Sequence, residues 1–382
     1  MVSPTFDLIV IGGGPAGAMA AYHAARAGLS VLILEKASFP RLKPCGGGLT
    51  IKTIARIPFS LHSVLYGASD VLWVGLRDEK TKQLRARGAV AAFTLREQFD
   101  SLLLDTAIGA GAELRVIKAL QNVVECPDGV TVQTDGGEFS GRYLVGADGA
   151  NSQVRRMIGA EFGFHRGFAL EGLVPYTRIA PRPEMTFDFG CVDYGYGWLF
   201  PKSDHVNVGL YTCSAYVPLS KNALRDYCEH KLGTADIDNI VGYPLGMGGS
   251  RYFAGKSRVL LVGDAAGLVE PLYGEGLHNA VKSGELAGQS VAAAVAGGIP
   301  AAMIYDRAMA DVRADIRRCS IIAWRLVYPY MDLVGYRSAK MPILRSALMN
   351  GYAAGKTIRE ITNNVFTARS ARPLWSADVL PG

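Results

Sequence analysis

Three glycines near the N-terminus, Gly12, Gly14 and Gly17, have the GxGxxG spacing of turns that hold a dinucleotide pyrophosphate. The first glycine permits a tight turn, the second lets the backbone approach a phosphate, and the third lets a helix pack on a strand. Ala16 falls in the same turn, where the start of the following helix faces the phosphates. Glu35 is placed to accept hydrogen bonds from an adenosine ribose. An acidic residue there disfavours a 2′-phosphate, so FAD or NAD is expected rather than NADP.

The predicted elements around these glycines give the spacing its weight, because a lone GxGxxG arises often by chance in a chain with 45 glycines. The apolar run 6–11 predicts a buried strand, the alanine-rich stretch 18–27 predicts a helix closed by Gly28, and 31–35 predicts a second strand. This order of strand, turn, helix and strand is typical of a nucleotide-binding unit. The alternative is an ordinary turn of the same kind that holds no ligand.

Two aspartates farther along the chain, Asp148 and Asp264, each follow a short apolar strand pattern and precede a plausible helix. Ligands bind at the carboxyl edge of open α/β sheets, so a carboxylate at such a strand end is a candidate ligand contact. Gly274 and Gly276 follow, and both would let the backbone approach a flat ring. Because these strands must return to the first strand from distant parts of the sequence, the nucleotide-binding domain is predicted to be discontinuous.

A cysteine and a strip of aromatic residues are the candidate reactive groups. Cys45 precedes Gly46 to Gly48 in a loop that can approach a ligand closely, and Arg41 lies just before it. Four aromatic residues alternate along the sequence, so on a strand they would share one face and form an apolar wall: Tyr194, Tyr196, Trp198 and Phe200. The alternatives are an inert buried thiol and plain core packing.

Taken in order, these motifs resemble the flavoprotein superfamily that includes aromatic hydroxylases and geranylgeranyl reductases. The resemblance implies FAD as cofactor, with its ribityl chain on Asp264 and its isoalloxazine against the turn Gly274 to Leu277. It also implies that Arg96 reaches the FAD phosphates and that the backbone of Ala119 lies beside the adenine. The cysteine loop and the aromatic strip are similar to those of the geranylgeranyl reductases in particular. The expected cofactor-binding residues are therefore Gly12, Gly14, Ala16, Gly17, Glu35, Lys36, Arg41, Cys45, Gly46, Gly48, Arg96, Ala119, Asp148, Asp264, Gly274, Gly276 and Leu277.

The composition is that of a globular protein with a sizeable core, since 49% of its 382 residues are hydrophobic and 19% are charged. The net charge is +6, but Lys and Arg are scattered, which argues against nucleic-acid binding and leaves peripheral contact with an anionic membrane open. The six cysteines show no metal-ligand spacing, so no metal is expected and a cytoplasmic location is. The first strand begins close to Met1, leaving no room for a signal peptide, and no apolar run is long enough to span a bilayer.

We expect an α/β fold with a Rossmann-like FAD-binding domain of the hydroxylase-like flavoprotein type, an antiparallel β-sheet substrate domain and C-terminal helices. The FAD-binding domain is expected from residues 1–75, 93–165 and 250–300, the substrate domain from 76–92 and 166–249, and the helical region from 301–382. The patterns predict helices over 93–109, 277–295 and 301–323, and strands over 185–189, 197–200 and 206–212. They also predict a β-rich insertion over 114–124 and 130–139, with a turn at Asp128-Gly129. The tail 319–350 mixes apolar and basic residues, as both a helical cap and a membrane-contacting surface do.

The expected function, as the family resemblance implies, is reduction of carbon–carbon double bonds in an isoprenoid chain by hydride from reduced flavin. The proton would come from Cys45, Tyr194, Tyr196 or a bound water. Electrons would come from NAD(P)H or a ferredoxin, because no second dinucleotide motif is visible. One alternative is a flavin monooxygenase acting on an aromatic or apolar substrate. Another is a flavin-binding assembly or partner protein that uses the aromatic face as an interface.

Overall fold

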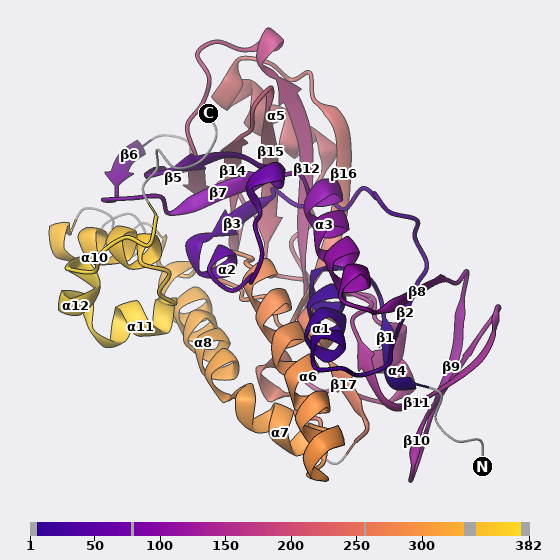
Figure 1. Cartoon of the computed structure of the whole chain (residues 1–382). Helices are drawn as coiled ribbons and strands as arrows, with labels where there is room; N and C mark the ends of the chain where they lie inside the picture. Colours follow the sequence, from indigo (N-terminus) through magenta and orange to yellow (C-terminus); the bar gives the residue numbers. More distant parts are fainter. Residues whose placement is uncertain (1–5, 78–79, 256, 332–340, 376–382) are drawn as a thin grey trace.

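The first sheet is built around the strands that the glycine-rich turns follow. In the computed structural model, which describes residues 6–77, 80–255, 257–331 and 341–375, parallel strands β8, β2, β1, β11 and β17 lie side by side (Figure 1). Strands β10 and β9 continue this sheet as antiparallel neighbours of β11. The bounds are β1 Phe6–Ile11, β2 Val31–Glu35, β8 Glu113–Val116, β9 Leu120–Cys126, β10 Gly129–Thr134, β11 Gly137–Gly146 and β17 Val259–Leu261.

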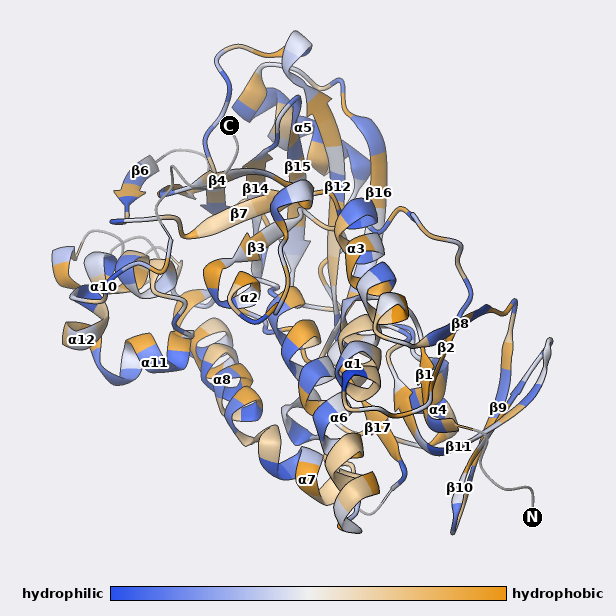
Figure 2. Cartoon of the chain, in the orientation of Figure 1, coloured by the Kyte–Doolittle hydropathy of each residue, from blue (hydrophilic) through white to orange (hydrophobic). Residues whose placement is uncertain are grey.

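Helices cover the parallel strands and bury them, and for this reason these strands consist of continuous apolar runs. Leu8, Ile9 and Val10 of β1 are fully buried, and Figure 2 shows the hydrophobic colouring of β1 and β17. Helix α1 (Pro15–Arg26) packs against α3 (Arg96–Gly109) and α6 (Leu277–Gly297). A Cβ on Gly284 would lie 2.1 Å from the carbonyl oxygen of Ala16, so glycine is what lets α6 touch α1 this closely.

The second sheet has the order β16, β12, β15, β14, β13, β5 and β6, and every pair in it is antiparallel except β5 with β13. Helix α5 (Lys221–Leu232) packs on β12 and β15, and a small third sheet of β3, β7 and β4 lies between the large ones (Figure 1). The bounds are β3 Gly48–Thr50, β4 Leu65–Ser69, β5 Val71–Leu76, β6 Lys80–Arg85, β7 Ala91–Thr94, β12 His165–Pro175, β13 Thr186–Phe189, β14 Gly195–Pro201, β15 His205–Thr212 and β16 Asp238–Met247.

The C-terminal part, from Ala301 onward, is helical. Its elements are α7 Ala301–Ala308, α8 Ala310–Ile321, a π-helical segment Ile322–Val327, α10 Pro342–Ala353, α11 Ile358–Asn363 and α12 Val365–Arg369. Helices α8, α10, α11 and α12 lie at the left of Figure 1 and α7 at the bottom. Shorter helices elsewhere are α2 Ile51–Ile54 and α4 Gln153–Met157, with 3₁₀ turns η1 His62–Val64, η2 Tyr176–Arg178, η3 Gly249–Arg251 and η4 Gly263–Ala266. Within the described residues, none of these helices combines the length and apolarity needed to cross a bilayer.

The α/β architecture with an antiparallel sheet and C-terminal helices is confirmed, but two local predictions were wrong. The helix expected from 93 begins at Arg96, because Phe93 belongs to β7, where it pairs with Gly48. The β-rich insertion expected over 114–124 consists of β8 and β9, and between them the N–H groups of Lys118 and Ala119 donate to the Asp135 carboxylate. The helix expected over 301–323 is broken at Met309. The three-part domain division stays a prediction, although β5 of the second sheet already begins at Val71.

Candidate active site

The first glycine-rich turn leaves β1 with its backbone open toward a ligand. Gly12 has φ +103°, and a Cβ there would lie 2.6 Å from the carbonyl oxygen of Ala147. A Cβ on Gly17 would lie 1.9 Å from the carbonyl oxygen of Gly12, so both positions require glycine. Helix α1 starts at Pro15 with Gly14 as N-cap, and neither a capping side chain nor an acid occupies its first turn. The positive end of the helix is therefore free to face an anion.

Glu35 ends β2 directly beside this turn. Its Oε2 accepts a hydrogen bond from the Gly13 N–H at 2.6 Å, and its Oε1 accepts from the N–H groups of Lys36 and Ala37, both at 2.8 Å. The carboxylate is only 6% exposed. It therefore fixes the glycine turn from behind, while its contact with a ribose stays a prediction, as does any role of Lys36.

Two arginines share one buried carboxylate next to Gly14. Arg96 donates from Nε and Nη2 to Asp100, both at 2.7 Å, and Arg41 Nη2 lies 3.2 Å from the same fully buried side chain. Burial alone would lower the pKa of Arg96, but the charge of Asp100 raises it above its ordinary value. Arg41 Nη2 would be 3.3 Å from a Cβ on Gly14. The two arginines and the single Asp100 carboxylate therefore have a net positive charge, and this charge lies next to the glycine turn.

Asp264 lies in η4 on the other side of the proposed binding region. Its carboxylate is partly buried, accepts a hydrogen bond from the Gly246 N–H at 3.4 Å, and has its pKa raised by desolvation. Burial and the charge of Arg96 lower the pKa of the nearby Lys43 to about 8, and its Nζ lies 3.0 Å from the centroid of the Tyr243 ring. The Asp264 carboxylate and the Lys43 ammonium group therefore lie close enough to interact through their charges.

The turn after Asp264 brings backbone close to the same region. Gly274 has φ +63°, and a Cβ there would lie 2.8 Å from the Tyr211 ring. Gly276 is the N-cap of α6, which begins at Leu277 without a capping side chain, so this helix also directs its positive end outward. A Cβ on Gly276 would be 3.4 Å from Asp264 Oδ1. Asp264, Gly274, Gly276 and Leu277 are therefore neighbours, as the sequence predicted for one binding edge.

Two other predicted cofactor residues have structural contacts of their own. Asp148 accepts hydrogen bonds from the Ser152 hydroxyl and from the N–H groups of Gln153 and Val154, and so holds the start of α4. Ala119 lies between β8 and β9, where its N–H donates to Asp135. Their contacts with a cofactor stay predictions.

The cysteine loop lies against the antiparallel sheet. The Cys45 N–H donates to Glu171 Oε1 at 2.7 Å, and the Cys45 side chain forms a hydrogen bond with Arg96. A Cβ on Gly46 would be 2.8 Å from the Phe200 ring, and one on Gly48 would be 3.1 Å from it. The loop therefore touches the aromatic strip directly, and its glycines are what permit this approach.

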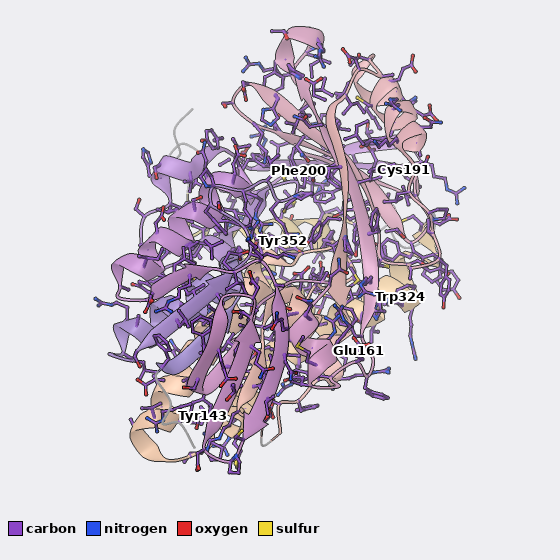
Figure 3. The ribbon with its side chains drawn as sticks, turned by 90° about the vertical axis from the view of Figure 1, so that its right-hand side faces the viewer. Tyr143, Glu161, Cys191, Phe200, Trp324 and Tyr352 are labelled. Atoms are coloured by element: carbon purple, nitrogen blue, oxygen red, sulfur yellow. The ribbon has the colours of Figure 1, made fainter. Side chains whose placement is uncertain are left out.

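Three of the four aromatic residues form the expected wall. Tyr196, Trp198 and Phe200 point to one face of β14, where the Tyr196 ring lies 4.9 Å from that of Phe187 and 6.2 Å from that of Trp198. Phe200 and Tyr352 of α10 both pack against one buried hydrophobic cluster, and both are labelled in Figure 3.

The fourth aromatic residue corrects the prediction that all four share a strand face. Tyr194 precedes β14, has φ +53° and is 40% exposed. Its ring lies 5.2 Å from Trp324 in the C-terminal helices, which Figure 3 shows well away from Phe200. Tyr194 lines a separate cleft of about 470 Å³ with Arg77, Cys191 and Tyr328. The positive φ at the turn into β14 is what takes Tyr194 off the wall.

Sequence reasoning missed the buried polar residues beneath the cysteine loop. Three of them are less than 10% exposed: Glu171 in β12, Asn207 in β15 and Lys202 directly after β14. Lys202 Nζ donates to the carbonyl oxygens of Gly46 at 2.7 Å and Thr94 at 3.1 Å. The available signal was a charged residue inside an otherwise apolar strand pattern, as Glu171 is in β12.

Comparison with known proteins agrees with this geometry. A family model described as an FAD binding domain matches residues 5–188. Menaquinone reductase of Mycobacterium tuberculosis is 33% identical over 325 residues, covering 75% of this chain and 77% of that protein. Digeranylgeranylglycerophospholipid reductase 2 of Methanothermobacter thermautotrophicus is 32% identical over 329 residues, covering 77% and 79%. The chain belongs to the geranylgeranyl reductase family of flavoproteins.

A solved structure supports the fold of this flavoprotein. A geranylgeranyl bacteriochlorophyll reductase-like protein of Thermoplasma acidophilum aligns over 96% of both chains, with a TM-score of 0.68 at 22% identity. The family resemblance inferred from the motifs is thus confirmed, and the protein is an FAD-dependent oxidoreductase.

The residues of this flavoprotein fit FAD by their own geometry. Arg41 Nη1 is buried and has no hydrogen-bond partner among the described residues, which is costly unless an acceptor is supplied. It lies at the open glycine turn, where a pyrophosphate would supply that acceptor. Gly14, Arg41 and Arg96 would then hold the phosphates, and Asp264 with the turn at Gly274 would hold the ribityl and ring end. The described residues contain no cluster of His, Cys, Asp and Glu suited to a metal ion.

Proposed function

We propose that this reductase adds two hydrogen atoms across a carbon–carbon double bond of an isoprenoid chain. The observation that carries the proposal is the contact between the Cys45 loop and the wall of Tyr196, Trp198 and Phe200, which places a thiol beside a cluster of apolar aromatic side chains. The names of the relatives, a menaquinone reductase and a digeranylgeranylglycerophospholipid reductase, support a prenyl-type substrate. FAD, when bound and reduced, supplies the hydride.

The aromatic wall would bind and orient the substrate. Ring faces offer large, rigid apolar area to a hydrocarbon chain and leave water no polar partner. From Tyr196 to Phe200 the wall advances four residues, about 13 Å at about 3.3 Å per residue. This length suits an extended prenyl chain better than a single aromatic ring. The loop at Gly46 closes the Phe200 end of the wall.

Cys45 is the proton donor that we favour among the candidates. The Tyr196 hydroxyl already donates to the carbonyl oxygen of Tyr273, and burial, with the charge of Glu270, raises the pKa of Tyr196 well above its ordinary value. Tyr194 lies off the wall, in the cleft that it lines with Arg77 and Tyr328. The Cys45 Sγ–H would move its proton to an alkene carbon, and the thiolate left behind would lie beside the Arg96 guanidinium.

The test is anaerobic reoxidation of the reduced enzyme. Chemically reduced holoenzyme is mixed without oxygen with a geranylgeranyl lipid, and flavin absorbance is followed. We expect reoxidation with the unsaturated lipid and none with its fully saturated analogue. A requirement for oxygen would indicate the monooxygenase instead, and a flavin unaffected by any lipid, quinone or aromatic ligand would indicate the non-enzymatic partner protein. The electron donor, NAD(P)H or ferredoxin, and peripheral membrane contact stay predictions.

A further inference from the structure

The cysteine loop is held by two buried charged side chains that the chemistry described above does not use. Glu171 Oε1 accepts from the Cys45 N–H at 2.7 Å, and Lys202 Nζ donates to the Gly46 carbonyl oxygen at 2.7 Å. The two hydrogen bonds thus hold the backbone of two consecutive residues of the same loop, Cys45 and Gly46. Gly46, Gly47 and Gly48 have no side chain, so hydrogen bonds to this part of the loop must be made with its backbone.

The strand register explains how these side chains reach the loop. Glu171 in β12 and Trp198 in β14 are both paired with Gly209 of β15, which lies between those strands. Asn207, two residues earlier in β15, accepts from Trp198 Nε1 at 2.7 Å and also hydrogen-bonds Glu171. The aromatic wall, the amide and the carboxylate therefore form one connected set under the loop.

Charges this deeply buried require a specific reason. Lys202 is 7% exposed and Glu171 is 8% exposed, and taking an ion out of water is costly unless it is paired. Burial lowers the pKa of Lys202 to about 7 and raises that of Glu171 to about 6. The other charged or titratable groups acting on this pair are Arg96 and Cys45. A stable fold alone would be served as well by apolar residues of similar volume.

We propose that Lys202 and Glu171 are positioning residues that clamp the backbone of the Cys45 loop onto the aromatic wall and so fix the place of the Cys45 thiol. Lys202 also donates to the Thr94 carbonyl oxygen at 3.1 Å, and the Thr94 N–H donates to the Gly47 carbonyl oxygen at 2.8 Å. The clamp therefore ties the loop to β7 as well as to β14. Its consequence for alkene reduction rests on the proposed function, whereas the clamp itself does not.

The test measures exposure of the Cys45 thiol directly. Holoenzyme is treated with iodoacetamide, and peptide mass spectrometry gives the alkylation rate of Cys45 relative to the exposed Cys126 in the same sample. We expect Lys202→Met and Glu171→Ala each to raise this ratio about tenfold, because each removes a charge-assisted hydrogen bond to the loop. Glu171→Gln keeps an acceptor for the Cys45 N–H, so its ratio should stay near wild type. Exposed Lys221→Met is the matched control.

The outcomes separate the clamp from the proposed function. An unchanged ratio in folded Lys202→Met overturns the clamp, and if that variant does not fold, equal ratios in Glu171→Gln and Glu171→Ala overturn it. A split in kinetics is also expected, with kcat for a prenyl substrate lowered in Lys202→Met and KM little changed. A raised Cys45 ratio in an enzyme that reduces no prenyl lipid, even as wild type, would keep the clamp and refute the function.

Discussion

The contact of Arg41 with the FAD phosphates gives a prediction whose size follows from the structure. Arg41→Met removes a guanidinium whose buried Nη1 has no partner among the described residues and whose Nη2 lies at Gly14. A hydrogen bond to a charged group is worth about 1.5–3 kcal/mol, so FAD affinity should fall about 10- to 150-fold. The fold should tolerate the change, because Asp100 keeps both hydrogen bonds from Arg96.

The assay titrates deflavinated protein with FAD and follows quenching of flavin fluorescence. Arg115→Met is the matched control, because Arg115 pairs with Glu113 on β8 with 49% of its side chain exposed. The control should bind FAD as wild type does, since an exposed pair contributes little. An unchanged dissociation constant for Arg41→Met would refute the reasoning. So would a fall in unfolding free energy large enough to account for the lost affinity.

Three further predictions concern the loop and its neighbours. Cys45→Ala and Cys45→Ser should retain FAD absorbance but slow alkene reduction. Tyr196→Phe should leave the rate within a few-fold of wild type. Unchanged turnover in the Cys45 variants would show that Cys45 serves only in packing. Gly46→Ala should cost about 1–3 kcal/mol of unfolding free energy in denaturant titration, because its Cβ would meet the Phe200 ring, while Gly109→Ala, with open space around it, should not destabilise. Unfolding free energy should rise from pH 7 toward 10, by at most about 1.4 kcal/mol per pH unit from Lys202, because the folded state gives up that proton near pH 7 and the unfolded chain keeps it to about 10.5. A Lys202→Met variant that keeps the same rise would contradict the last prediction.

The nucleotide-binding end could be predicted because its signals are local in sequence. Gly12, Gly14 and Gly17 act within one turn, and the strand before them is recognisable from its own apolar run. The strand that ends near Asp264 was predictable for the same reason, since a buried parallel strand needs a continuous hydrophobic segment. The glycines and the apolar residues are required by the backbone geometry of the turn and by the burial of the strand. Both can therefore be recognised in a single sequence.

The substrate end was less predictable because long-range pairing decides it. Phe93 is in a strand and not in the expected helix, because it pairs with Gly48 of β3, 45 residues earlier in the chain. Tyr194 fits the alternating pattern of the strip, yet a positive φ takes it to another cleft. Glu171 and Lys202 become neighbours of Cys45 only through the register of β12, β15 and β14, which no local pattern specifies.

The most direct test of the central claim is mass spectrometry of a prenyl lipid after anaerobic incubation with stoichiometric, chemically reduced enzyme. The account predicts a product that has gained two hydrogen atoms per double bond reduced, with matching oxidation of the flavin and no incorporated oxygen. The Cys45→Ala variant should form this product more slowly while holding the same amount of FAD. An unchanged lipid mass without oxygen, followed by an oxygenated product once air is admitted, would contradict the account.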